Sequence, residues 1–438
     1  MPPTLEFRVR QLRYDLGSGL LFRPGMIILA LATLAVVLSV TARGATAWLF
    51  PGEPSAAQMV LGTIASSMMT VVSVVYSILL VALSLVSMQF STRILRRFVR
   101  DAVSQTTLGL FIGTFVYCLL MLRVVQATPH PVVPALGVGV GVLLAVASMA
   151  WLVFFIHHIA QIIQANFLID QIAEESEAVI DQVLPARASP QLPPQAPPLP
   201  EGWRELPAHP ILAPVSGYVQ LIDFGALASA ASAQGGVCEV LTDIGHFAAA
   251  GAPMARLYAT QPLADEDLET VRGAFDIGPV RTMQDDAEFG VRQIVDIALK
   301  ALSPAVNDPS TAVTCIDHLT RLLVRAARRD DAPGRWAPTD SPVARVAREG
   351  ASFRALVNLA VTQIRQYGRA DMAVGLRLLR ALETVAGVTD DPARRALLAR
   401  HGALIESALR EHFPAEDCEA LDERVARLRA ATLTSPRA

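Results

Sequence analysis

One stretch of the sequence concentrates side chains that could do chemistry. The chain is 52% hydrophobic and only 18% charged, yet residues 281–312 begin with an arginine and are dense in carboxylates and amides. Such groups can bind an ion or a small ligand, or they can hold helix ends together. The candidate residues of this polar motif are Arg281, Gln284, Asp285, Gln293, Asp296, Asn307 and Asp308.

Three interpretations of the polar motif are open. Arg281 could bridge Asp285 or Asp308 and so tie a strand end to two helix starts, which is a structural role. Alternatively, Arg281, Gln284, Asp285, Asn307 and Asp308 could form a cytoplasmic site for a ligand or an ion. Catalysis is the third interpretation, but Ser303 has no neighbouring histidine and no nucleophile–base pair is evident. We therefore predict no enzyme and no catalytic residues.

A second polar pattern lies inside an apolar segment. Hydroxyl residues recur every seven positions, and a second series fills the partnering phase, with Leu80 as its interruption. A 3.5-residue repeat keeps one face of a helix turned toward its partners. Hydroxyls on that face allow tight helix packing, or they can line a water-filled path. The predicted pore-lining residues are Thr63, Ser66, Thr70, Ser73, Ser77, Ser84 and Ser87.

The elements that must position these residues divide the chain in two. Residues 1–158 contain ten Arg and four acidic residues, a net charge of +6, whereas the rest has 27 Lys and Arg against 36 acids, a net charge of −9. A basic apolar half joined to an acidic half is not a nucleic-acid-binding profile. Apolar segments at 25–42, 59–88, 108–125 and 132–156 are each long enough to cross a bilayer.

The flanking arginines predict the orientation of these spans. Arginines gather in the amino-terminal arm and in the loop after the second span, so both lie in the cytoplasm, as does everything after the fourth span. This orientation predicts a multi-pass protein of an inner (cell) membrane, with both termini cytoplasmic. Four arginines of that second loop either form a cytoplasmic vestibule or simply anchor the protein: Arg93, Arg96, Arg97 and Arg100.

The acidic half is expected to be an α+β region. Short β-prone runs between turn residues, such as 213–219 and 245–254, resemble the entry and exit strands of a small lipoyl-like β-barrel, although no lysine lies there to carry a cofactor. Residues 285–302 show the spacing of an amphipathic helix, and Asp308-Pro309 is a start signal for the next one. The expected parts are a cytoplasmic arm at 1–24, a four-helix transmembrane domain at 25–157, a helical extension at 158–184, a Pro-rich linker at 185–200, a small β-rich module at 201–262, a polar-motif helical segment at 263–330, a linker at 331–342 and C-terminal helices at 343–438.

The four spans, the Ser-Gly-Tyr-Val-Gln segment at 216–220 and the polar motif together resemble a bacterial family of predicted membrane proteins, domain of unknown function 2254. The resemblance implies this topology but supplies no activity and no catalytic residues. The four cysteines lie far apart and no metal-ligand spacing is present, so we expect neither a metal nor a cofactor.

Two hypotheses of function follow. The first is a homo-oligomeric membrane protein with a channel-like or transport path, lined by the hydroxyl row of the second span and controlled by a cytoplasmic regulatory domain. The second is a membrane-anchored cytoplasmic sensor or scaffold without a pore. The expected partners are the lipid bilayer, further copies of the chain and an ion or small ligand, with no nucleic acid.

Overall fold

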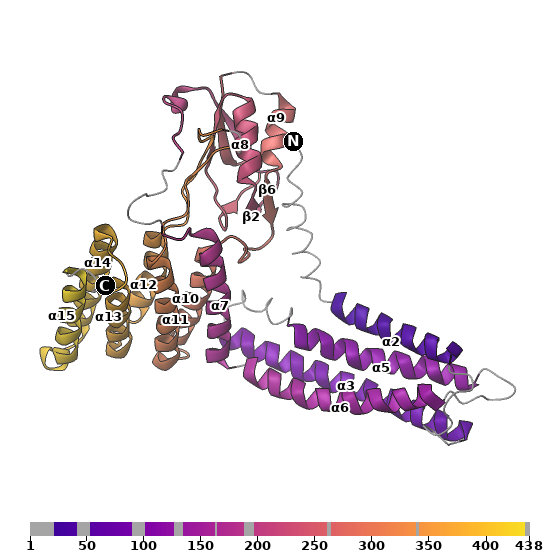
Figure 1. Cartoon of the computed structure of the whole chain (residues 1–438). Coiled ribbons are helices and arrows are strands. Elements are labelled where there is room, and N and C mark those ends of the chain that lie inside the picture. The colour runs from indigo at the N-terminus through magenta and orange to yellow at the C-terminus, as the bar shows by residue number, and fades with distance from the viewer. Residues whose placement is uncertain are drawn as a thin grey trace. The chain divides into compact units, whose positions relative to one another are not determined.

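The computed structural model describes residues 22–41, 53–89, 101–126, 135–162, 164–187, 197–260, 264–338 and 341–433. The chain forms two compact units, one within residues 10–167 and the other made chiefly of residues 168–438. We call them the membrane unit and the α+β unit, and Figure 1 shows the elements of each.

The membrane unit consists of apolar helices. Four helices of the described chain are long and apolar enough to cross a membrane, which confirms the four predicted spans. These helices are α2 (Phe22–Thr41), α3 (Pro54–Gln89), α5 (Ala102–Gln126) and α6 (Ala135–Ile162).

Helix α5 is the centre of the membrane unit and packs against the other three helices. Gly109 and Gly113 permit this packing, because a Cβ atom at Gly109 would lie 3.0 Å from the Pro24 Cα of α2. Buried polar groups join α5 to α6: the Tyr117 hydroxyl donates to the Gly137 carbonyl at 2.8 Å. The unit therefore has a core of its own, which contains Tyr117, Phe111, Leu61 and Met121.

The α+β unit contains most of the remaining helices. Several begin with an Asp or Ser side chain that accepts a backbone N–H, as the polar residues before each apolar run require. The prediction that Asp308 caps a helix with Pro309 in its first turn is confirmed. The helices are α7 (Ala165–Val183), α8 (Phe224–Ala233), α9 (Asp265–Arg272), α10 (Ala287–Ala301), α11 (Pro309–Ala327), α12 (Phe353–Tyr367), α13 (Met372–Ala386), α14 (Pro392–His412) and α15 (Glu419–Leu433).

The strands form two open sheets, so the predicted β-barrel-like closure is wrong for the described residues. One sheet has the order β1-β5-β3-β8-β7 and the other the order β4-β2-β6. All pairings are antiparallel except that of β3 with β8. The strands are β1 (Ala208–Leu212), β2 (Gly217–Ile222), β3 (Val237–Val240), β4 (Phe247–Ala248), β5 (Pro253–Tyr258), β6 (Phe275–Gly278), β7 (Arg335–Trp336) and β8 (Val346–Ala347).

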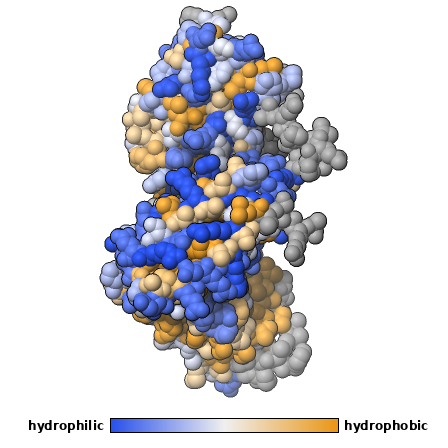
Figure 2. All heavy atoms as spheres, turned by 90° about the vertical axis from the view of Figure 1, so that its left-hand side faces the viewer, coloured by the Kyte–Doolittle hydropathy of each residue, from blue (hydrophilic) through white to orange (hydrophobic). Residues whose placement is uncertain are grey.

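The outer helices of the α+β unit present a polar surface. Figure 2 shows that hydrophilic residues predominate over the helices α14 and α15, with apolar side chains scattered among them. Beneath this surface, Leu397, Leu398, Leu421 and Leu428 are buried. The polar surface and the apolar interior indicate that these helices fold as a water-facing bundle.

Candidate functional site

The hydroxyl row of α3 faces away from its own chain. Buried residues of α3 lie on the other side of the helix, where Leu61, Ala65 and Val72 contact the rest of the membrane unit. The row is therefore not used for packing within one chain. Its described side chains are all exposed: Thr63, Ser66, Thr70, Ser73, Ser77 and Ser84.

Most of these hydroxyls have an intrahelical hydrogen bond. Thr63 Oγ1 donates to the Met59 carbonyl at 2.7 Å, and Ser77 Oγ donates to the Ser73 carbonyl at 2.9 Å. Thr70 and Ser73 donate to the carbonyls four residues earlier in the same way. Each such bond satisfies the hydroxyl proton and leaves the oxygen lone pairs free to accept. The row thus presents a line of acceptor oxygens.

Five of the predicted residues follow Ser84 in the chain. The side chain of Ser87 and the predicted vestibule residues Arg93, Arg96, Arg97 and Arg100 lie outside the described residues.

In the polar motif, Arg281 is bound to Asp286. Arg281 Nε donates to Asp286 Oδ2 at 2.6 Å, and Nη2 donates to Oδ1 at 2.9 Å. The same carboxylate caps α10, since Oδ1 accepts the Phe289 N–H at 3.0 Å. Arg281 was predicted to bridge Asp285 or Asp308. That prediction is wrong, because the partner is Asp286, next to Asp285 in the sequence. Asp285 has a φ of 54°, which turns its carboxylate away to accept a hydrogen bond from Gln182 of α7.

A turn of the β-strand region closes over this ion pair. Gly245 has a φ of 82°, and a Cβ atom there would overlap Asp286 Oδ2 and lie 2.7 Å from Arg281 Nε. Only glycine combines that conformation with so close an approach. We call the group formed by this turn and the start of α10 the α10 cap cluster; its members are Asp243, His246, Arg281, Asp286 and Glu288.

Burial sets the protonation of this cluster. Burial, together with the neighbouring Asp286 carboxylate, raises the pKa of Glu288 above its ordinary value. Burial also raises the pKa of Asp243, although Arg348 Nη1 lies 2.9 Å from its Oδ1 and acts in the opposite direction. Glu288 and Asp243 therefore hold a proton to a higher pH than exposed carboxylates do.

The structure divides the predicted polar motif between the two ends of α10. Arg281, Gln284 and Asp285 precede this 15-residue helix, whereas Asn307 and Asp308 follow it. At 1.5 Å per residue the two groups are about 22 Å apart. Asp308 instead caps α11, accepting the Thr311 N–H at 3.0 Å. One ligand site that contains all five residues is therefore not formed.

The remaining motif residues serve α10 itself. Gln293 and Phe289 are buried. Gln284 and Asp296 are half-buried. Among the described residues, no group of three or more His, Cys, Asp or Glu side chains is arranged to hold a metal ion.

A second polar assembly, which the sequence analysis missed, joins α7 to α11. Arg321 binds Glu177 through two hydrogen bonds of 2.8 and 2.7 Å and Asp170 through one of 3.0 Å. Arg325 and Arg329 both pair with Asp181. The signal was present in the spacing, because Arg321, Arg325 and Arg329 recur every four residues. We call these six residues the α7–α11 ladder.

Comparison with known proteins identifies a family of membrane proteins. A family model described as "Predicted membrane protein (DUF2254)" matches residues 18–384. Uncharacterised proteins of Mycobacterium bovis and of two strains of Mycobacterium tuberculosis are each 32% identical over 390 residues, which cover 85% of this chain and 72% of theirs. No solved structure matches. The chain belongs to the family of predicted membrane proteins known as domain of unknown function 2254.

Proposed function

We propose that this membrane protein is a homo-oligomer in which α3 helices from several copies surround a channel-like path. The observation that carries the proposal is that the hydroxyl row is exposed on the side of α3 opposite its buried residues. A polar face on a membrane helix is stabilised when it meets another polar face or water. Further copies of the same helix supply such a face.

The chemistry of the row suits water and small ions. The apolar window Pro54–Ser84 has no Asp, Glu, Lys or Arg, so an ion in the path would meet hydroxyl oxygens and not fixed charges. Because several hydroxyls donate to their own helix, their oxygens are directed to act as acceptors. Acceptor oxygens replace part of the hydration shell of a cation.

The α+β unit is the proposed cytoplasmic regulatory domain. Its cytoplasmic location rests on the arginines flanking the spans, which also favour a cytoplasmic position for both termini of a protein in a bacterial inner membrane. Its link to the path is α7, which begins at Ala165, shortly after α6 ends at Ile162.

Conductance across planar bilayers tests the path. Purified wild-type protein is expected to conduct at least one small ion, and Ser73→Leu with Ser77→Leu is expected to abolish or strongly reduce the current. Thr33→Leu is the matched control, since Thr33 is an exposed hydroxyl on α2 that donates to the Leu29 carbonyl in the same way. Absence of current for every ion tried, or equal currents in both variants, contradicts the proposal.

A second candidate function is a membrane-anchored sensor or scaffold without a pore. The observation that favours it is that the α+β unit, made chiefly of residues 168–438, holds both the α10 cap cluster and the α7–α11 ladder. The number of copies in mild detergent separates the two functions. Four or more copies leave room for a path on the symmetry axis, whereas a monomer or dimer supports the anchored sensor.

A further inference from the structure

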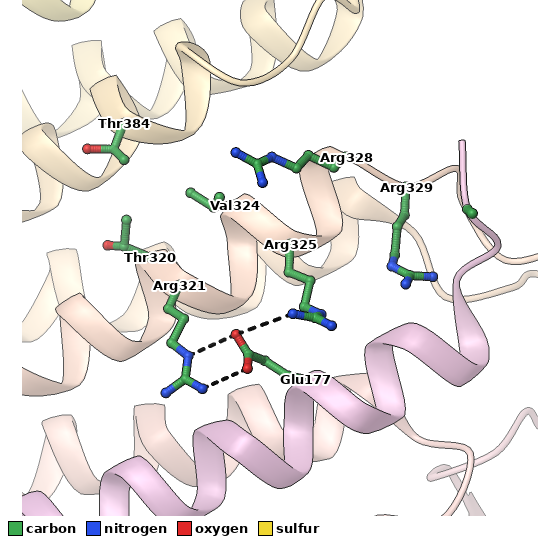
Figure 3. A pocket seen from close by; sticks show the side chains of 9 residues that line it. Glu177, Thr320, Arg321, Val324, Arg325, Arg328, Arg329 and Thr384 are labelled. Carbon is green, nitrogen blue, oxygen red and sulfur yellow. Dashed lines mark hydrogen bonds and ion pairs between the residues drawn. The ribbon is translucent and has the colours of Figure 1, made fainter. Parts of the chain in front are cut away.

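A pocket opens beside the α7–α11 ladder. It has a volume of about 540 Å³ and is lined by residues of α7, α11 and α13, together with Ala186, Arg328 and Arg329 (Figure 3). This volume lies in the range of about 300–1,000 Å³ that is typical of small-molecule sites. Its polar lining consists of Glu177, Thr320, Arg321, Arg325, Arg328, Arg329 and Thr384.

The charges that line the pocket do not balance. Four arginines face one lining carboxylate, Glu177, which Arg321 binds through both oxygens and Arg325 approaches to 4.0 Å. Adding Asp170 and Asp181, the two ladder carboxylates that do not line the pocket, still leaves one positive charge in excess.

That excess charge belongs to Arg328. Within the described parts of the chain, Arg328 has no acidic partner, and its side chain is exposed. Figure 3 shows it apart from the Glu177 pairs, on the side of the pocket where Thr384 of α13 lies. The nearby acid Glu383 is already paired with Arg424 at 3.0 Å.

The hydroxyls of the pocket can serve the same ligand. Thr320 Oγ1 donates to the Ile316 carbonyl at 2.7 Å, and Thr384 Oγ1 donates to the Arg380 carbonyl at 2.9 Å. A threonine hydroxyl can rotate from such a bond to donate to an anion, because the helix carbonyl keeps its backbone N–H partner. A planar guanidinium and two hydroxyls that line one pocket are a donor set suited to phosphate oxygens.

We propose that this pocket binds a phosphate-bearing anion, held by Arg328 with Thr384 and Thr320. The neighbouring ladder arginines contribute long-range attraction, while Glu177 remains neutralised by the arginines that it already binds. The phosphate can belong to a free small molecule or to a lipid headgroup, since the two present the same oxygens. This proposal does not depend on the channel-like path, because every residue involved lies in the α+β unit.

Binding of inorganic pyrophosphate to the full chain in neutral detergent tests the free-anion source. Isothermal titration is expected to show saturable binding that weakens about ten-fold or more in Arg328→Gln, the loss of one charge-assisted contact. Thr384→Val is expected to weaken it about three-fold, which corresponds to one neutral hydrogen bond. Arg369→Gln is the matched control: it removes an exposed arginine of the α+β unit outside the pocket and should leave the affinity unchanged.

A second titration, with mixed micelles that contain phosphatidic acid, tests the headgroup source. Saturable binding in either titration that falls in Arg328→Gln but not in Arg369→Gln supports the pocket and identifies the source. The proposal is overturned if neither probe binds saturably, or if the two arginine variants lose affinity equally. Arg328 is exposed at the end of α11, and an unchanged unfolding temperature of Arg328→Gln shows that lost binding does not reflect misfolding.

Discussion

At the scale of single residues, Asp286 combines a helix cap with an ion pair. It caps α10, and it holds Arg281 in an ion pair whose side chains are only 4% and 21% exposed. Asp308 caps α11 and accepts both the Thr311 N–H at 3.0 Å and the Thr311 hydroxyl at 2.6 Å. Comparing these two aspartates sets a cap that also holds a largely buried arginine against a cap whose partners lie in its own helix.

We expect Asp286→Ala to lower the stability of the α+β unit by about 2–4 kcal/mol, because it removes a cap and leaves a largely buried arginine without its partner. Asp308→Ala is expected to cost about 1 kcal/mol, the usual value for a cap. Differential scanning fluorimetry of the full chain in detergent compares the two. Equal shifts in unfolding temperature would show that the Arg281 pair adds nothing to the cap.

Glu288 in the same cluster makes stability depend on pH. Its pKa is raised in the folded chain, chiefly by burial and next by Asp286, so the folded state binds its proton more tightly than the unfolded state. The stability that Glu288 contributes is therefore present below its ordinary pKa and is lost as pH rises through the raised value.

Glu288→Gln is accordingly expected to raise the unfolding temperature at pH 8 and to leave it nearly unchanged at pH 4, where the native side chain is already protonated. Glu174→Gln, on the exposed side of α7, is the control and should have little effect at either pH. A gain from Glu288→Gln that is equal at both pH values would mean that the charge of Glu288 is not what costs stability.

At the scale of elements, the α7–α11 ladder is the main polar contact that holds α7 against the helical part of its unit. Arg321 and Arg325 are 39% and 42% exposed, so each pair is worth little by itself, about 0.2–1 kcal/mol. Three arginines that share three carboxylates act together. Their joint removal leaves α7 with its apolar contacts, which include buried Ile169, Ile172 and Ile180.

Replacing Arg321, Arg325 and Arg329 together by Ala is expected to free α7 before it unfolds the unit. Hydrogen exchange should become about five- to thirty-fold faster in α7, which corresponds to a loss of about 1–2 kcal/mol of local stability, and should stay unchanged in α10. Arg427→Ala breaks a surface pair within α15 and controls for loss of charge. Uniformly faster exchange across the unit would show that the ladder supports the whole fold and not α7 in particular.

The elements that could be predicted are those with local signals. The apolar lengths predicted the spans, and Asp308-Pro309 predicted the start of α11. Strands β7 and β8 contain two residues each, and β8 pairs in parallel with β3 from more than 100 residues earlier. A run so short has no hydrophobic period, and a pairing so distant leaves no pattern in the sequence.

The candidate site was predictable only in part for the same reason. The polar motif included Arg281, which does belong to the cluster. Asp243, His246 and Arg348 could not be predicted, because they come from other segments of the chain and share no sequence spacing with the motif. The partner of Arg281 was misassigned because the positive φ of Asp285 cannot be inferred from its residue type alone. Backbone conformation, and not composition, decides which of two adjacent aspartates faces the arginine.

At the scale of the whole molecule, the two units meet covalently where α6 gives way to α7. Helix α7 belongs mainly to the α+β unit, carries Glu177 of the pocket, and follows the fourth span, α6, in the chain. The proposed anion site and the proposed path therefore lie on opposite sides of this connection in the sequence. The path itself requires that α3 helices of different copies face one another.

Cysteine cross-linking tests this arrangement directly. All four native cysteines, Cys118, Cys238, Cys315 and Cys418, are buried, so the wild-type background should remain uncross-linked. Ser73→Cys on the hydroxyl row is expected to form a disulfide between copies under mild oxidation in native membranes, because symmetry brings the same position of each α3 to one axis. Leu143→Cys, on α6 and 66% exposed, faces lipid in this arrangement and should stay monomeric on a non-reducing gel. Cross-linking of Leu143→Cys but not of Ser73→Cys would place the interface on α6 and remove the hydroxyl row from the axis.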